Sequence, residues 1–239
     1  MSDFHVDLSG QVAIVTGAAR DMGRAIAVAL ARSGAAVCAV DVNPDRLDET
    51  VHLIADHGGR ALGWTGDVSN RFQVAALIEA TRDAFGGLHL MVNATTADKR
   101  AALLSLDEYD WRRSIEINLT GAFFCTQLAA RVMASEGGGA IVNVLSPVGT
   151  LRSAQDAAPL AASHAGLLGL TRQAARELIG QGVRVNAVCV YPDSAVAGAP
   201  LGRAVSLDDV TAAVLFLCSD GAAAITGQTL VVDGGGSLL

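Results

Sequence analysis

The segment QVAIVTGAARDMGRAIAVALARS, residues 11–33, decides the fold that we expect for this chain. It opens with a short run rich in β-branched residues, passes through a glycine-containing turn, and closes with an alanine-rich amphipathic stretch. That order predicts a strand, a tight turn and a helix, which together form the first unit of an α/β fold. Such a turn presents backbone N–H groups and the positive end of a helix dipole, which suits a dinucleotide pyrophosphate.

The same alternation of apolar runs and amphipathic stretches continues to the end of the chain. Further strands are predicted at residues 37–42, 60–67, 89–94, 140–145, 183–190 and 229–232, and helices at residues 44–56, 73–85, 111–134, 160–179 and 207–218. Regular alternation of this kind predicts an α/β fold with a Rossmann-type, doubly wound parallel sheet of about seven strands and helices on both faces. We expect residues 1–239 to form a single domain.

The composition excludes several classes of protein. The chain is 51% hydrophobic and 17% charged, which suits a sheet buried on both faces. A formal net charge of -7 without a basic stripe argues against a nucleic-acid partner. The four cysteines occur singly, so we expect no metal site and no redox dithiol. We see no signal pattern and no membrane-spanning run, and therefore expect a cytoplasmic protein with no membrane partner.

The first turn, TGAARDMG (residues 16–23), resembles the TGxxxGxG turn of the short-chain dehydrogenase/reductase family. Gly17 and Gly23 match the pattern and Met22 lies between its last two glycine positions, but Asp21 stands where the family has glycine or alanine. A carboxylate there would repel a pyrophosphate, and its side chain would obstruct the close approach of the backbone. We therefore expect cofactor affinity to be reduced.

Three acidic or apolar residues resemble the family's adenosine-binding positions. Asp41 ends the second strand, where this fold places the acid that binds the adenosine ribose, so any cofactor would be NAD rather than NADP. An equally good interpretation of Asp41 taken alone is an N-cap or turn residue. Asp67 and Val68 match the family's adenine-contacting pair.

The family's NNAG motif survives only in part, as Asn93 and Ala94 followed by Thr95 in place of glycine. The resemblance also identifies Asn118, in IEINLTGAFF, with the family's structural and proton-relay asparagine. A buried asparagine that bonds backbone groups would be kept for folding alone, so Asn118 says little about catalysis.

The departures from the family pattern are largest in the segment that matches the family's catalytic residues. Ser146 matches the family's catalytic serine, but the YxxxK motif is replaced by LAASH, with Leu160 and His164 at the Tyr and Lys positions. The family's chemistry requires a phenol as general acid/base, with its pKa lowered by a nearby ammonium. We favour a partly buried helix histidine for His164 over a Ser146/His164 nucleophile and base pair.

The segment after the sixth strand also departs from the family. Its Pro-Gly is replaced by Val190-Tyr191, and residues 192–199 form a shorter link than the usual substrate-covering loop. The predicted scaffold is otherwise complete, including the long helices through which family members assemble.

The main hypothesis is a non-catalytic subunit (pseudoenzyme) that supports an active NAD-dependent short-chain dehydrogenase in a heteromer, or that forms a homodimer or tetramer. It would bind no cofactor or bind NAD(H) weakly. One alternative is an NAD-dependent oxidoreductase of hydroxyl or keto substrates, or a repurposed enzyme, that uses Ser146 with His164 or Tyr191. Another is a dinucleotide-binding sensor.

Overall fold

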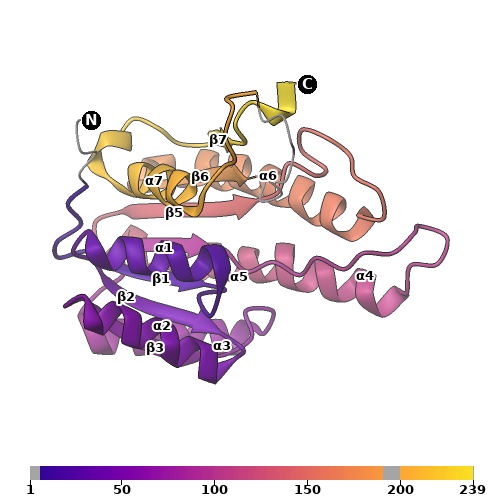
Figure 1. Cartoon of the computed structure of the whole chain (residues 1–239). Coiled ribbons are helices and arrows are strands. Elements are labelled where there is room, and N and C mark those ends of the chain that lie inside the picture. Colours follow the sequence, from indigo (N-terminus) through magenta and orange to yellow (C-terminus); the bar gives the residue numbers. More distant parts are fainter. Residues whose placement is uncertain (1–5, 191–199, 239) are drawn as a thin grey trace.

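A computed structural model describes residues 6–190 and 200–238 of the chain. Its centre is a seven-stranded, wholly parallel sheet in the order β3-β2-β1-β4-β5-β6-β7 (Figure 1). The strands are β1 (Val12–Thr16), β2 (Ala36–Asp41), β3 (Arg60–Thr65), β4 (Leu90–Asn93), β5 (Gly139–Leu145), β6 (Val183–Val190) and β7 (Thr229–Val232). The predicted Rossmann-type sheet is therefore confirmed.

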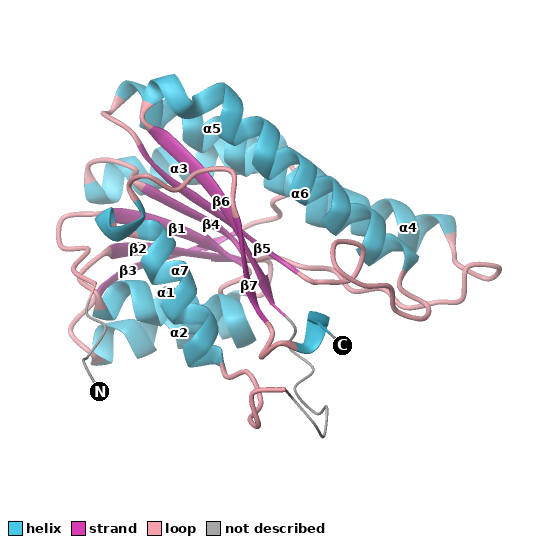
Figure 2. Ribbon diagram, turned by 90° about the horizontal axis from the view of Figure 1, so that it is seen from above, coloured by secondary structure: helices cyan, strands magenta, loops and turns pink. Residues whose placement is uncertain are grey.

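Helices cover both faces of this sheet, as Figure 2 shows, with α1, α2 and α7 on one side and α3, α5 and α6 on the other. The helices are α1 (Asp21–Arg32), α2 (Pro44–Asp56), α3 (Arg71–Phe85), α4 (Glu108–Ile115), α5 (Ala122–Ser135), α6 (Ala158–Leu178) and α7 (Leu207–Cys218). All five residues of β1 are buried, because helices shield both faces of the central strands.

The order of the strands decides where a site can form. From β1 the chain winds outward to β2 and β3, and it then returns to the other side of β1 with β4. The carboxyl ends of β1 and β4 therefore lie at a topological switch point, where loops diverge and leave a crevice.

One predicted element differs from the structure. The single helix expected over residues 111–134 is instead α4, a π-helical segment η1 (Glu116–Gly121) and α5. Asn118 lies in η1 with its side chain buried, and it bonds both backbone groups of Ala97, through Oδ1 to N at 2.7 Å and through Nδ2 to O at 3.0 Å. The interpretation of Asn118 as a residue that organises the fold agrees with these bonds.

Other expectations concern the cysteines, metal binding and membrane-spanning helices. All four cysteines are free and buried. Among residues 6–190 and 200–238, no group of His, Cys, Asp and Glu side chains could hold a metal ion. No helix in the same ranges is long and apolar enough to cross a bilayer.

Candidate functional site

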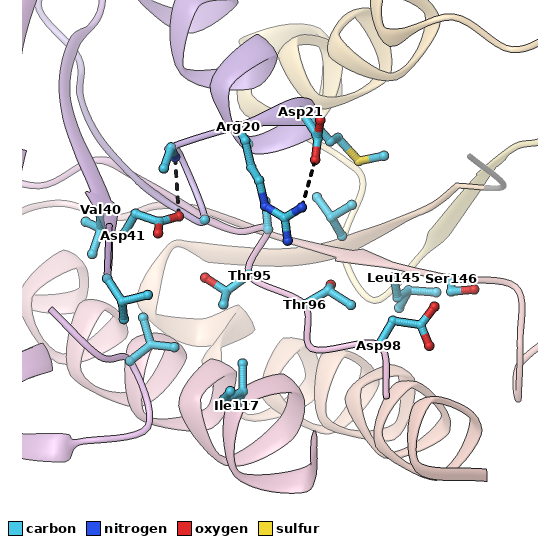
Figure 3. Close-up of a pocket in the computed structure, with 18 of the residues that line it drawn as sticks. Arg20, Asp21, Val40, Asp41, Thr95, Thr96, Asp98, Ile117, Leu145 and Ser146 are labelled. Atoms are coloured by element: carbon cyan, nitrogen blue, oxygen red, sulfur yellow. Dashed lines mark hydrogen bonds and ion pairs between the residues drawn. The ribbon is translucent and has the colours of Figure 1, made fainter. Parts of the chain in front are cut away.

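A cleft of about 730 Å³ opens at the carboxyl ends of β1, β2, β4 and β5 (Figure 3). The residues singled out from the sequence that line it are Gly17, Asp21, Met22, Gly23, Asp41, Asp67, Val68, Ala94, Thr95, Ser146, Leu160, His164 and Val190. The fold thus gathers into one cleft most of the residues that the sequence singled out.

The backbone around the glycine turn is packed so tightly that a side chain at Gly17 or Gly23 would clash with neighbouring backbone atoms. Gly17 has a φ of +69°, and a Cβ on it would lie 3.0 Å from the carbonyl oxygen of Ala94. A Cβ on Gly23 would lie 2.0 Å from the carbonyl oxygen of Gly17. The hydroxyl of Thr16 accepts hydrogen bonds from the amides of Ala94 (3.1 Å) and Thr95 (3.3 Å) and ties the turn to the loop after β4. The backbone of a dinucleotide cradle is therefore intact.

Asp21 keeps the backbone conformation that a glycine would adopt at this point. Its φ is +47°, and aspartate is one of the few residues that tolerate this left-handed region. Its side chain is 76% exposed, with a carboxylate oxygen 3.4 Å from a guanidinium nitrogen of Arg20 (Figure 3). The side chain lines the cleft and places a negative charge at the start of α1.

Asp41 joins the second strand to the glycine turn. Its Oδ2 accepts from the amide of Ala19 at 3.3 Å and its Oδ1 from the amide of Asn43 at 3.1 Å. The N-cap of α2 is Asn43, whose side chain accepts from the amide of Arg46. Asp41 is therefore not the N-cap of α2, but its bond to the amide two residues ahead agrees with the turn-residue interpretation, and Asp41 also lines the cleft.

Asp67 is held by an ion pair that the sequence did not reveal. Its Oδ2 lies 2.6 Å from Nη2 of Arg113, and its Oδ1 accepts from the amide of Ser69 at 2.9 Å and from its hydroxyl at 2.7 Å. Burial by itself raises the pKa of Asp67, but the hydrogen bonds from Arg113 and Ser69 outweigh it and hold the pKa below its usual value. The carboxylate is ionised at neutral pH.

The side chain of Asn93 does not line the cleft. Its side chain is buried beneath the cleft, where Nδ2 donates to Oδ1 of Asn143 at 2.8 Å and to the hydroxyl of Thr126 at 3.3 Å. The side-chain amide of Asn93 therefore links β4 to β5 in the core and is not part of the cleft lining. Ala94, the next residue, does line the cleft.

His164 contacts Ser146, but not as a base contacts a nucleophile. Nδ1 of His164 accepts a hydrogen bond from the backbone amide of Ser146 at 2.6 Å, whereas the Ser146 hydroxyl accepts from the amide of Val148 at 3.2 Å. The imidazole is 2% exposed, so it is fully buried rather than partly buried. Burial lowers the pKa of His164 to about 4, against a small opposing effect of the negative charge on Asp98.

Leu160 contributes an apolar side chain to the wall of the cleft. It is 3% exposed and packs in a small apolar cluster with Val148 and Ala157. Among the residues that the structure describes, no tyrosine lines the cleft. Tyr109, the tyrosine within the described ranges, is exposed at the start of α4. Tyr191 and the shortened link at residues 192–199 lie outside the described residues.

Sequence reasoning missed Asp98, Arg100 and Arg113, all of which line the cleft. Asp98 and Arg100 pair at 2.7 Å on the loop after β4, which no local sequence pattern identifies. Arg113 did carry a signal, since it lies four residues before the cleft-lining Ile117 and therefore on the same helix face.

Comparison with known proteins identifies the family. The short chain dehydrogenase model matches residues 11–197, and the Enoyl-(Acyl carrier protein) reductase model matches residues 191–237. The chain belongs to the short-chain dehydrogenase family.

Two named relatives align over almost their whole length. Cis-4-hydroxycyclohexanecarboxylate dehydrogenase of Sinomonas cyclohexanicum is 41% identical, over 94% of this chain and 96% of that protein. A subunit of (2S)-[(R)-hydroxy(phenyl)methyl]succinyl-CoA dehydrogenase of Thauera aromatica is 34% identical, over 97% and 98%. A short-chain type dehydrogenase/reductase structure from Mycobacterium marinum superposes with a TM-score of 0.90 at 32% identity, over 96% of each chain. Oxidoreductases are thus the class of protein to which this chain is similar.

Proposed function

We propose that this chain is a non-catalytic subunit that assembles, in the cytoplasm, with an active NAD-dependent short-chain dehydrogenase. The observation that carries the proposal is the pair Leu160 and His164 beside Ser146. Interconversion of an alcohol and a ketone moves a hydride and a proton, and the proton needs a side chain of suitable pKa within hydrogen-bond reach. Leucine has no proton to exchange.

His164 does not supply the missing group. At neutral pH an imidazole with a pKa of about 4 is uncharged, and the N–H that remains on a neutral ring is too weak an acid to give up its proton. Its basic nitrogen, Nδ1, already accepts from the Ser146 amide, so protonation there would break that bond. The remaining nitrogen, Nε2, carries the proton of the neutral ring and can only donate.

The cleft fits the adenosine half of a dinucleotide better than the nicotinamide half. Gly17 and Gly23 leave room for a pyrophosphate, and the Asp41 carboxylate suits a ribose with free hydroxyls and repels a 2′-phosphate. When bound, NAD would supply a hydride acceptor. No ammonium stands at position 164 to hold the second ribose, so we propose weak binding with a preference for NAD over NADP.

Exposed apolar side chains support the assembly part of the proposal. Trp111 on α4 and Phe123 on α5 are partly exposed, as are Leu230 and Val231 on β7. Large apolar side chains at a surface are typical of subunit contacts. The name of the Thauera aromatica relative identifies it as one subunit of a dehydrogenase, which also favours a role within a larger assembly.

The test is co-purification from the native source, followed by assay of the complex and of the isolated chain. We expect an active short-chain dehydrogenase to co-purify and NADH to form only when that partner is present. Ser146→Ala in this chain should leave the activity of the complex unchanged. Turnover by the isolated chain that disappears in Ser146→Ala would show that the proposal is wrong.

The comparisons favour a second candidate, an NAD-dependent oxidoreductase acting on a hydroxyl or keto substrate. Relatives at 33–41% identity carry the names of dehydrogenases and reductases, and a cleft with Ser146 in place is retained. This candidate needs a proton carrier, which would be His164 after rearrangement or Tyr191. His164→Ala or Tyr191→Phe should then abolish turnover without changing the oligomer.

A third candidate, a dinucleotide sensor, is supported by the intact glycine turn alone. It requires tight binding without turnover. Calorimetric titration with NAD(H) and NADP(H) decides it, because absence of heat and of any thermal shift would eliminate a sensor.

A further inference from the structure

The two ends of the cleft offer different polar groups to a ligand. The first end lies at the glycine turn, near Arg20 and Asp41, and the second lies around Asp98 and Ser146 (Figure 3). The side chain of Thr95 lies between the two ends. A dinucleotide whose diphosphate lies against the glycine turn would therefore place its second half at the second end.

The first end has donors that no part of the described chain uses. A helix leaves its first backbone amides without partners inside the helix, and α1 begins at this end. Four residues that line the cleft have amides without a hydrogen bond to any residue in the ranges 6–190 and 200–238: Arg20, Asp21, Met22 and Gly23. These amides, together with the positive end of the helix dipole, suit the oxygens of a diphosphate.

Two charged side chains add to these amides. One nitrogen of Arg24 donates to the carbonyl oxygens of both Ala19 and Arg46, so Arg46 lies beside the turn. Arg46 lines the cleft, and its guanidinium makes no hydrogen bond or ion pair to the described residues. Asp41 also lines the cleft, and its carboxylate has lone pairs that can accept from a ribose hydroxyl. The first end therefore provides partners for a diphosphate and for the ribose that precedes it.

The polar groups of the second end are bonded mainly to one another. Arg100 donates to both carboxylate oxygens of Asp98, at 2.7 Å each. Nδ1 of His164 accepts from the Ser146 amide at 2.6 Å, and the ring is uncharged at neutral pH. Other side chains that line this end are apolar: Leu145, Val148, Leu160 and Val190. A ligand here meets the Ser146 hydroxyl and one N–H of the imidazole, both of them neutral.

We propose that the ligand of this cleft is an adenosine diphosphate group itself, as ADP or ADP-ribose, and that a nicotinamide riboside attached to it adds no affinity. The inference rests on the part of the proposed function in which the cleft accepts a dinucleotide. It goes further by naming the part of the dinucleotide that is bound and the class of ligand that follows from it.

Two opposing effects act on a nicotinamide riboside at the second end. Its ring can pack against apolar side chains such as Leu160, which favours binding. Its carboxamide and its ribose hydroxyls, however, leave water for a wall with few partners, which disfavours binding. Hydrogen bonds to charged groups are roughly twice as strong as those between neutral groups, and the second end offers the ribose neutral groups. We therefore expect the two effects to offset each other.

The experiment is calorimetric titration of the purified chain with ADP, ADP-ribose and NADH. The dissociation constant of NADH should be no lower than that of ADP-ribose, within about twofold. The emission maximum of NADH should not move on binding, because a ring that stays in water keeps the emission of the free dinucleotide. Tighter binding of ADP would identify the terminal phosphate as the recognised group, and tighter binding of ADP-ribose would identify its terminal ribose.

Two variants separate the contributions of the two ends. Asp41→Asn removes a charge from the first end and should weaken all three ligands by the same factor, about tenfold. Ser146→Ala removes a donor from the second end and gives up one bond of 3.2 Å to the Val148 amide. It should leave the three dissociation constants within about twofold of those of the unmodified chain. A loss of NADH affinity alone in Ser146→Ala would overturn the inference.

The outcome for this ligand class is separate from the outcome for the non-catalytic proposal. If NADH binds at least about tenfold more tightly than ADP-ribose, or if its emission shifts to the blue, the inference is wrong. It is also wrong if none of the three ligands binds. The non-catalytic proposal is decided by the partner that co-purifies and by turnover of the isolated chain, neither of which depends on these titrations.

Discussion

Replacement of Asp21 separates two effects that the glycine turn combines, backbone conformation and charge. In Asp21→Gly the backbone keeps its positive φ without a Cβ, which relieves strain of roughly 1 kcal/mol. The same change raises the entropy of the unfolded chain by about 0.5–1 kcal/mol and removes a favourable charge at the start of α1, worth about 0.3–1 kcal/mol. We therefore expect the free energy of unfolding to change by less than about 1 kcal/mol.

The effect of Asp21→Gly on binding should be larger. Because the Asp21 side chain is 76% exposed, its repulsion of a pyrophosphate acts through a water-like dielectric and amounts to roughly 1 kcal/mol for charges a few ångströms apart. Removal of that repulsion should tighten NAD+ binding about fivefold to tenfold, less so at high ionic strength.

Asp21→Asn is the matched variant, because asparagine also tolerates a positive φ but carries no charge. Calorimetric titration at low and high salt should give Asp21→Asn most of the gain seen in Asp21→Gly. If Asp21→Gly tightens binding and Asp21→Asn does not, the barrier is steric and the electrostatic reasoning is refuted.

Three further predictions concern stability. Folding lowers the pKa of His164, so the unfolded chain binds a proton that the folded chain does not, and the free energy of unfolding falls as the pH drops below about 6.5. Urea unfolding at pH 7 and pH 5 should show a loss of about 2 kcal/mol. His164→Asn should largely remove this loss. Gly23→Ala should lower the free energy of unfolding by several kcal/mol or prevent folding, since its Cβ would lie 2.0 Å from the Gly17 carbonyl oxygen. The control is Gly169→Ala, at an open position on α6, which should raise the free energy of unfolding by about 1 kcal/mol and with it the melting temperature. Leu160→Tyr and His164→Lys should each lower the free energy of unfolding. In the double variant the loss should be smaller than the sum of the two single losses by about 1–3 kcal/mol. Additive losses in this double-mutant cycle would contradict the coupling.

The sequence predicted the fold well because its signals are local. The central strands are short apolar runs that are buried on both faces, and the predicted residues 60–67 and 183–190 lie close to the observed β3 and β6. The split of the predicted helix at residues 111–134 was missed because η1 depends on contacts between distant segments. Asn118 bonds the loop residue Ala97 and the hydroxyl of Ser163 on α6, and neither contact has a local signature.

The sequence indicated several of the residues that line the cleft, but not the hydrogen bonds that these residues make. Matching motif positions correctly identified the cleft residues Asp41, Asp67 and Ser146. The motif could not show that Asn93 faces the core, because the side of a strand on which a residue lies depends on how β4 pairs with β5. Nor could it show that Arg113, from another element, holds Asp67.

The side chains at positions 160 and 164 are physically consistent with each other only as the pair Leu160 and His164. A lysine at 164 beside Leu160 would bury an ammonium with no phenol to receive its hydrogen bond, at a high desolvation cost. A tyrosine at 160 beside His164 would place a hydroxyl in the apolar cluster around Val148. With leucine at 160, a neutral imidazole is the better group at 164, because its Nδ1 accepts from the Ser146 amide and leaves no charge in the interior. The pair therefore stabilises the fold beside Ser146.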